Sequence, residues 1–214
     1  MSTNRQDELV REMHSLKLYL RNMKIIKFRI SSIKACRSNG LPSNYSFFNN
    51  VEFCVLQIRK ILELIAHSSL ISDAEIYRQQ LGKIEKMWNA KLILKDLERI
   101  HKDFYPQPVS LDPDDEVYER LVDKTEPFLT RDEFVKVYDK CGKMLHEFSP
   151  LEANETIENE FSVVWDSIDE WVEHIVQLLS QHIICLYNEH LFYIKLGDSD
   201  TEPTGRLMQK ESAN

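Results

Sequence analysis

The sequence predicts a mainly α-helical protein, a bundle of about five to six helices that carries a small β-hairpin at its C-terminal end. Apolar residues recur at helical spacing through most of the 214 residues. The chain contains only five glycines and seven prolines, too few for a β-sandwich with a turn every ten residues or so. Its composition, 43% hydrophobic and 29% charged, is that of an ordinary globular protein.

The first helix is expected from Asp7 to Ser31, where apolar residues follow one another every three or four positions. The turn-rich segment SNGLPSNYS separates it from a second helix at Phe47–Ile71. This second helix is apolar on most of its sides, which is typical of a helix buried at the centre of a core. Its main stripe consists of Val51, Cys54, Val55, Ile58, Ile61, Leu62 and Ile65.

Further helices are expected along the rest of the chain. Residues 73–100 have the pattern of one or two amphipathic helices, and the proline-rich stretch after His101 predicts an irregular excursion. Thr130 and Glu133 form a capping-box sequence that opens a helix over residues 128–149. A long amphipathic helix follows from Asn154 to Gln181.

The predicted organisation is a helical domain over residues 1–181, a packed β-hairpin over residues 182–197 and a polar, mobile tail over residues 198–214. The apolar runs HIICLY and LFYIKL flank the short turn NEH, as the two strands of a hairpin do. Within the tail, the segment GRLMQ has the composition for a third strand.

The net charge of −8 conceals two oppositely charged halves. Residues 1–100 carry a net charge of +7 and residues 101–214 a net charge of −15. The interval between Glu12 and Glu52 has no acidic residue and contains Lys17, Arg21, Lys24, Lys27, Arg29, Lys34 and Arg37. Such a basic face binds RNA phosphates or an acidic partner, or it meets the acidic half of its own fold. We favour the last interpretation because overall acidity opposes non-specific nucleic-acid binding.

Other patterns exclude several classes of protein. The charged N-terminal segment has no hydrophobic signal region and no stretch is long enough to cross a membrane, so a cytoplasmic protein without a membrane partner is expected. The cysteines are scattered without a close pair, which predicts reduced structural thiols and neither a metal nor a cofactor. They are Cys36, Cys54, Cys141 and Cys185.

A polar strip interrupts the predicted central helix. It consists of Glu52, Arg59, Glu63 and His67. Arg59 and Glu63 are four residues apart and can pair, as can Glu63 and His67. Because an unpaired buried charge is costly, the strip is interpreted either as an internal ion pair or as the lining of a functional cleft.

A second departure from the amphipathic pattern is the segment YDKCGKMLHE. Gly142 lies inside the predicted helix and is not a cap, which indicates close approach of another backbone within the fold or in a dimer. His146, one turn later, is a candidate general acid or base, or a plain surface or interface histidine. Weaker candidates are Asp166, Glu170 and His174 at metal-compatible spacing, and His182 and His190 facing each other across the hairpin.

At these two places the chain resembles the HEPN superfamily of all-helical domains. The segment Gln57–His67, QIRKILELIAH, is similar to the RxxxE helix of HEPN-like families, and Lys140–His146, KCGKMLH, is similar to their histidine motif. The chain also resembles uncharacterised bacterial proteins that share the element KDLERIHKDFYPQPV, Lys95–Val109. Many HEPN domains are metal-independent ribonucleases that work as dimers with two motifs at a shared cleft. The resemblance therefore implies catalytic roles for His146, Lys140, Arg59 and Glu63.

One departure from the family pattern separates two hypotheses. Lysine at position 140 stands where HEPN nucleases keep arginine, and lysine lacks the planar fork that suits a phosphate. The first hypothesis is therefore a non-enzymatic or degenerate HEPN-like module that acts through protein association, as a homodimer or with another protein. The alternative is a ribonuclease effector of a toxin–antitoxin or phage-defence system, with the basic interval guiding RNA.

Overall fold

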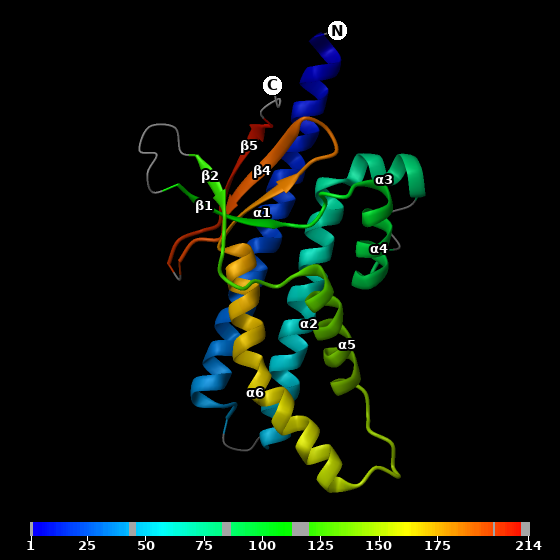
Figure 1. The fold of residues 1–214 in the computed structure, drawn as a ribbon, viewed down its shortest axis with the longest axis vertical. Coiled ribbons are helices and arrows are strands. Elements are labelled where there is room, and N and C mark those ends of the chain that lie inside the picture. The colour runs from blue at the N-terminus through cyan, green and yellow to red at the C-terminus, as the bar shows by residue number, and fades with distance from the viewer. Residues whose placement is uncertain (1, 43–45, 83–86, 113–119, 199, 211–214) are drawn as a thin grey trace.

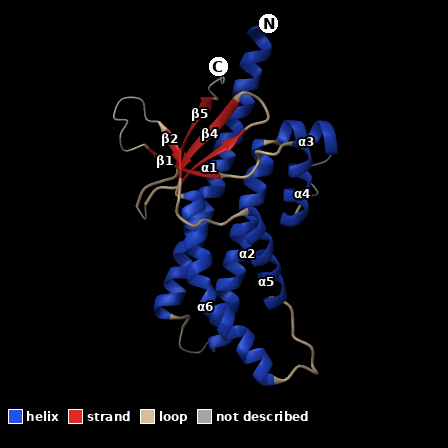
Figure 2. Ribbon diagram, in the orientation of Figure 1, coloured by secondary structure: helices blue, strands red, loops and turns tan. Residues whose placement is uncertain are grey.

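A computed structural model describes residues 2–42, 46–82, 87–112, 120–198 and 200–210 (Figure 1). In this part of the chain helices predominate, as predicted, and strands gather at one end of the molecule (Figure 2). The helices are α1 (Ser2–Asn39), α2 (Phe47–Ser72), α3 (Ala74–Leu81), α4 (Ala90–Ile100), α5 (Arg131–Met144) and α6 (Asn154–Leu179). The strands are β1 (Gln107–Leu111), β2 (Leu121–Asp123), β3 (Gln181–Cys185), β4 (His190–Lys195) and β5 (Thr204–Gln209).

Helix α2 is the buried centre of the bundle, as its sequence predicted. Every residue of the predicted apolar stripe, from Val51 to Ile65, is fully buried. The helix contacts α1, α3, α4, α5, α6 and strand β3, and in Figure 1 it runs between α6 and α5. Ser46 caps its N-terminus by accepting a hydrogen bond from the backbone N–H of Asn49.

Helix α1 is longer at both ends than the predicted Asp7–Ser31. Its apolar stripe continues through Ile33 and Cys36, which are 1% and 4% exposed, so helical packing against α2 extends beyond Ser31. Gly40 follows with a φ of 69°, a conformation that glycine adopts readily and that commonly ends a helix.

The prediction of a small C-terminal hairpin was incomplete, because the structure contains a five-stranded antiparallel sheet of order β2-β1-β3-β4-β5. The expected hairpin is β3 and β4, in which Ile183 pairs with Tyr193. The proline-rich stretch expected to be irregular supplies β1, whose Gln107 pairs with Ile183. This pairing joins segments about 75 residues apart, so nothing in the local pattern of QPVSL indicated it.

The segment GRLMQ forms the third C-terminal strand that its composition allowed. It is part of β5, which pairs with β4 and packs against α1. Gly205 lies where a Cβ atom would be 2.9 Å from Leu16 Cδ1 of α1, so glycine lets the strand approach the helix closely. The end of the expected mobile tail, residues 211–214, and residue 199 lie outside the described part.

The other predicted helices are present with changed ends. Thr130 accepts a hydrogen bond from the backbone N–H of Glu133 at 3.2 Å, as the capping sequence predicted. The Glu133 carboxylate bonds His174 Nδ1 of α6 at 2.6 Å, so this side chain links two helices. Helix α5 ends at Met144, five residues before the predicted end, and His146 therefore lies outside it.

The cysteines are free thiols. Cys36, Cys54 and Cys141 are buried and free, and Cys185 is half-buried and free, in agreement with structural thiols. Burial raises the pKa of the Cys141 thiol to about 12, which keeps it protonated.

No helix in the described ranges has the length and apolarity needed to span a membrane.

A buried histidine lies where the sheet meets the bundle. His182 is fully buried, and its Nδ1 donates to the carbonyl of Leu179 at 3.0 Å. The Tyr19 hydroxyl of α1 bonds His182 Nε2 at 2.8 Å, which fits a neutral ring that donates through Nδ1 and accepts at Nε2. Burial lowers the pKa of His182 to about 4, because the charged ring would lose its hydration.

This histidine makes stability depend on pH in a defined direction. Between the ordinary pKa of 6.5 and the folded value of about 4, the unfolded chain binds a proton that the folded chain does not. The free energy of unfolding therefore falls as the pH falls through this window, by up to about 1.4 kcal/mol per pH unit from His182. Urea unfolding at several pH values gives the free energy of unfolding as a function of pH. Between pH 4 and 6.5 this free energy should change less steeply with pH in His182→Gln than in wild type. The exposed-site control His146→Gln should keep the wild-type slope, and equal slopes for wild type and His182→Gln would contradict the assignment.

Candidate functional site

The predicted ion pair of the central helix is present and engages a tyrosine of α5. Arg59 Nε is 3.5 Å from Glu63 Oε1, and Lys60 Nζ is 2.7 Å from the other oxygen of Glu63. The Arg59 guanidinium lies 4.2 Å from the centre of the Tyr138 ring and donates through Nη2 to the Tyr138 hydroxyl at 3.0 Å. Charge pairing, a cation–π contact and a hydrogen bond therefore fix this side chain between α2 and α5.

The guanidinium of Arg59 also explains why residue 142 is a glycine. A Cβ atom at this position would lie 2.9 Å from Arg59 Nη1, closer than van der Waals contact. The expectation that Gly142 admits another backbone was wrong within the chain, because the group it admits is the side chain of Arg59. The two motifs that resembled HEPN sequences thus meet in space at Arg59 and Gly142.

Lys140 points to a different partner. Its ammonium and that of Lys143 both pair with Glu160 of α6, the second at 3.2 Å. The hydrogen bond from Lys140, followed by that from Lys143, lowers the pKa of the Glu160 carboxyl. Lys140 therefore ties α5 to α6, and among the described residues no hydrogen bond or ion pair joins it to Arg59 or His146.

His146 is exposed in the turn after α5. It lines a shallow pocket of about 380 Å³ at the N-terminal ends of α2 and α6. Three carboxylates, those of Glu52, Glu147 and Glu152, line this pocket as well, whereas Arg59, Glu63 and Lys140 do not. Within one chain the structure therefore brings Arg59 to Glu63 but does not bring His146 to either.

The remaining histidine candidates serve in structural contacts. His182 pairs across the hairpin with Ile194, so His182 and His190 do not face each other as the sequence suggested. His174 binds Glu133, and no group of three His, Cys, Asp or Glu side chains in the described part could hold a metal ion. Asp166 and Glu170 are exposed on α6.

A large cleft that the sequence did not indicate lies on the described surface. Its volume is about 870 Å³, and it lies between the N-terminal half of α1, the end of α2 with α3, and the β3–β4 turn. His67, the last residue of the predicted polar strip, lines this cleft. Burial lowers the pKa of His67, which favours the neutral ring at pH 7.

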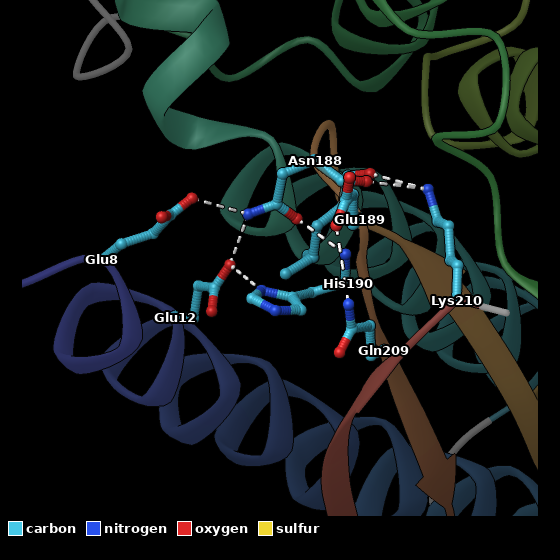
Figure 3. A network of polar contacts seen from close by, with 8 residues as sticks. Glu8, Glu12, Asn188, Glu189, His190, Gln209 and Lys210 are labelled. Carbon is cyan, nitrogen blue, oxygen red and sulfur yellow. Dashed lines mark hydrogen bonds and ion pairs between the residues drawn. The ribbon is translucent and has the colours of Figure 1, made fainter. Parts of the chain in front are cut away.

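A polar network fixes one wall of the cleft (Figure 3). Glu12 of α1 is 8% exposed, and its Oε1 accepts hydrogen bonds from Asn188 Nδ2 at 2.6 Å and His190 Nδ1 at 2.8 Å. Asn188 also donates to Glu8 at 2.9 Å, and Lys210 donates to the carbonyl of Asn188 from the end of β5. The bonds to Glu8 and Glu12 attach the β3–β4 turn to α1, and the bond from Lys210 attaches the turn to the end of β5, as Figure 3 shows.

Asp73 fixes the opposite wall. It ends α2, is 1% exposed, and its Oδ1 accepts a hydrogen bond from His101 Nδ1 at 2.8 Å. Burial raises the pKa of the Asp73 carboxyl, and the contact with His101 opposes this shift. The pair attaches the corner between α2 and α3 to the loop after α4.

Part of the basic interval meets the acidic C-terminal half, as favoured from the sequence. Lys24 pairs with Glu202 at 2.8 Å, and Arg37 donates through Nε to Asp169 at 3.0 Å. The Arg37 guanidinium also lies 4.0 Å from the centre of the Trp165 ring of α6. Arg29 binds Gln57 of α2, so the interval is divided among several partners and does not form a single free face.

No family model matches the chain, and neither a curated protein nor a solved structure matches it significantly. These comparisons neither support nor contradict the resemblance to HEPN domains.

The contact between Arg59 and Gly142 can be measured by a double-mutant cycle. Alanine is the better helix former, so Gly142→Ala should stabilise the Arg59→Ala background by about 0.5–1 kcal/mol. In wild type the new methyl group must displace a guanidinium held by Tyr138 and Glu63, so the same change should be neutral or destabilising. Denaturant unfolding of the four proteins gives the coupling energy. Lys60→Ala is the control background, because Lys60 pairs with Glu63 without contacting Gly142, and an identical effect of Gly142→Ala in all backgrounds would refute the contact.

Proposed function

We propose that this protein is a non-catalytic, HEPN-like helical module that acts by association with protein, as a homodimer or with another protein. The main support for the proposal is that the groups a ribonuclease would need are bound to other side chains or lie apart from one another. Arg59 is held by Tyr138 and Glu63, Lys140 by Glu160, and His146 stands apart in the turn after α5.

Electrostatics around His146 supports a non-catalytic role. RNA cleavage by an acid–base histidine requires positive groups that stabilise the charge developing on the phosphate. The pocket of His146 is lined by the carboxylates of Glu52, Glu147 and Glu152 and by no lysine or arginine. Three carboxylates repel a phosphate, so the single chain lacks the environment that this chemistry needs.

Exposed apolar side chains support association. Phe28 of α1 and Trp88 are each 73% exposed, and Leu151 is 94% exposed. Single exposed hydrophobic residues are common on monomers, but large aromatic residues are enriched where proteins bind one another. A module whose polar groups are occupied internally and whose aromatic groups are exposed is better suited to binding than to catalysis.

The ribonuclease alternative stays a prediction and has a direct test. Purified wild-type protein and His146→Ala should leave a structured RNA equally intact on denaturing gels, because neither has a competent site. RNA cleavage by wild type that disappears in His146→Ala, with Glu152→Gln as a control in the same pocket, would refute the non-catalytic proposal.

The homodimer is tested separately by sedimentation equilibrium over a hundredfold range of concentration. We expect a concentration-dependent dimer whose dissociation constant rises at least tenfold in Trp88→Glu or Phe28→Glu, because a buried charge opposes an apolar interface. A Gln80→Glu variant, at an exposed polar residue of α3, is the control for a general effect of charge. A monomer throughout the range would exclude the homodimer and leave association with another protein.

A further inference from the structure

The cleft between α1, α3 and the β3–β4 turn has an apolar floor and an apolar rim. Leu70 and Ile76 contribute to the lining from α2 and α3, and Phe192 contributes from β4. At the rim, Val10 is 65% exposed and Tyr187 is 55% exposed. Its volume of about 870 Å³ and its position between two helices make it a groove in which a further chain segment can bury apolar side chains.

Positive charge is available along this groove. Arg11 and Arg21 of α1 and Arg78 of α3 line it and are exposed. Within the described ranges, none of the three guanidinium groups has a hydrogen bond or an ion pair. Arg11 and Arg21 are ten residues apart on one helix, so their backbones are separated by about 15 Å along the axis, or roughly three helical turns.

Two of the four acidic residues that also line the groove, Glu12 and Asp73, are buried, and each has one carboxylate oxygen without a hydrogen bond among the described residues. Glu12 and Glu8 accept hydrogen bonds from the β3–β4 turn, and Asp73 accepts one from His101. The fourth, Glu75, accepts a hydrogen bond from Gln79 at 2.9 Å. The fully exposed charged side chains of the lining are therefore Arg11, Arg21, Arg78 and Glu75. The three arginines, whose planar forks pair well with carboxylates, outnumber the one exposed carboxylate.

We propose that this cleft is the docking site for an acidic, amphipathic segment of a protein partner, bound between α1 and α3. Apolar side chains of the segment cover the floor and contact Val10 and Tyr187, and its carboxylates pair with Arg11, Arg21 and Arg78. The length between Arg11 and Arg21 suits a helix of about three turns. This inference rests on the proposed function, since it names the partner of a module that acts by association.

Other occupants fit less well. RNA would leave the apolar floor of Leu70, Ile76 and Phe192 without a matching surface. A second copy of this chain offers the acidic helix α6, but the exposed apolar residue of that helix is the single Val163, too little to cover the floor. Both remain distinct outcomes of the experiment below.

The test selects partners from random sequence. A display library of 16-residue peptides is selected on immobilised full-length protein and counter-selected on the double variant Arg11→Glu/Arg78→Glu. Enriched peptides should be negatively charged, with apolar residues at positions i, i+3 or i+4, and i+7. A synthetic enriched peptide should bind wild type at least tenfold more tightly than the double variant, and raising the salt concentration should weaken binding.

Control variants separate this site from a general charge effect. The double variant Lys17→Glu/Lys34→Glu changes the net charge by the same amount as Arg11→Glu/Arg78→Glu. Both of its residues are exposed on α1 and neither lines the cleft, so it should bind the peptide as wild type does. Val10→Glu, at the exposed rim, should weaken binding without any loss of an arginine. Thermal melting of each variant establishes that it folds.

Several results would overturn the proposal. They are enrichment of basic peptides, failure to enrich any peptide that distinguishes wild type from the arginine variant, and equal weakening by the lysine control. Loss of self-association in the arginine variant would make a second copy the occupant, and arginine-dependent binding of a labelled 16-nucleotide single-stranded RNA would make the cleft a nucleic-acid site. The RNA-cleavage assay is independent of the peptide selection. RNA cleavage would refute the proposed association function, whereas a failed selection alone would refute only this docking site.

Discussion

The burial of α2 on most of its sides is the constraint on which the rest of the structure depends. A helix that is apolar on most of its sides must be surrounded, and here α1, α4, α5 and α6 pack around it and leave a narrow strip with Glu52, Leu56 and Lys60 exposed. The polar residues of such a helix cannot all reach water, so they need partners supplied by the surrounding helices. Arg59 meets this need with Glu63 on its own helix and with Tyr138 on α5.

That requirement explains a glycine which would otherwise be unfavourable. Gly142 lowers the helical preference of α5, yet a Cβ atom there would collide with the guanidinium of Arg59. The residues that resemble a nuclease motif are therefore accounted for by packing. A motif and an internal ion pair make similar demands on sequence, because both place charged residues at helical spacing on an apolar helix.

Histidine–carboxylate pairs attach the periphery to this core. Glu12 bonds His190 of the sheet, Asp73 bonds His101 after α4, and Glu133 bonds His174 of α6. Two of these three pairs involve carboxylates that line the large cleft, so the contacts that position the sheet and α3 also shape the cleft. The walls of the docking site are thereby fixed before a partner binds, which reduces the entropic cost of binding.

The sequence by itself determined the helical class, the burial of α2, the pairing of Arg59 with Glu63 and the β3–β4 hairpin. These features depend on residues close together along the chain, where periodicity and spacing carry the information. Tertiary structure alone decided that residues 107–123 join the C-terminal strands in one sheet, that Gly142 admits Arg59, and that α5 ends before His146. It also formed the cleft, because Arg11, Arg78 and Tyr187 are far apart in sequence and become neighbours only when α1, α3 and the β3–β4 turn pack around the end of α2.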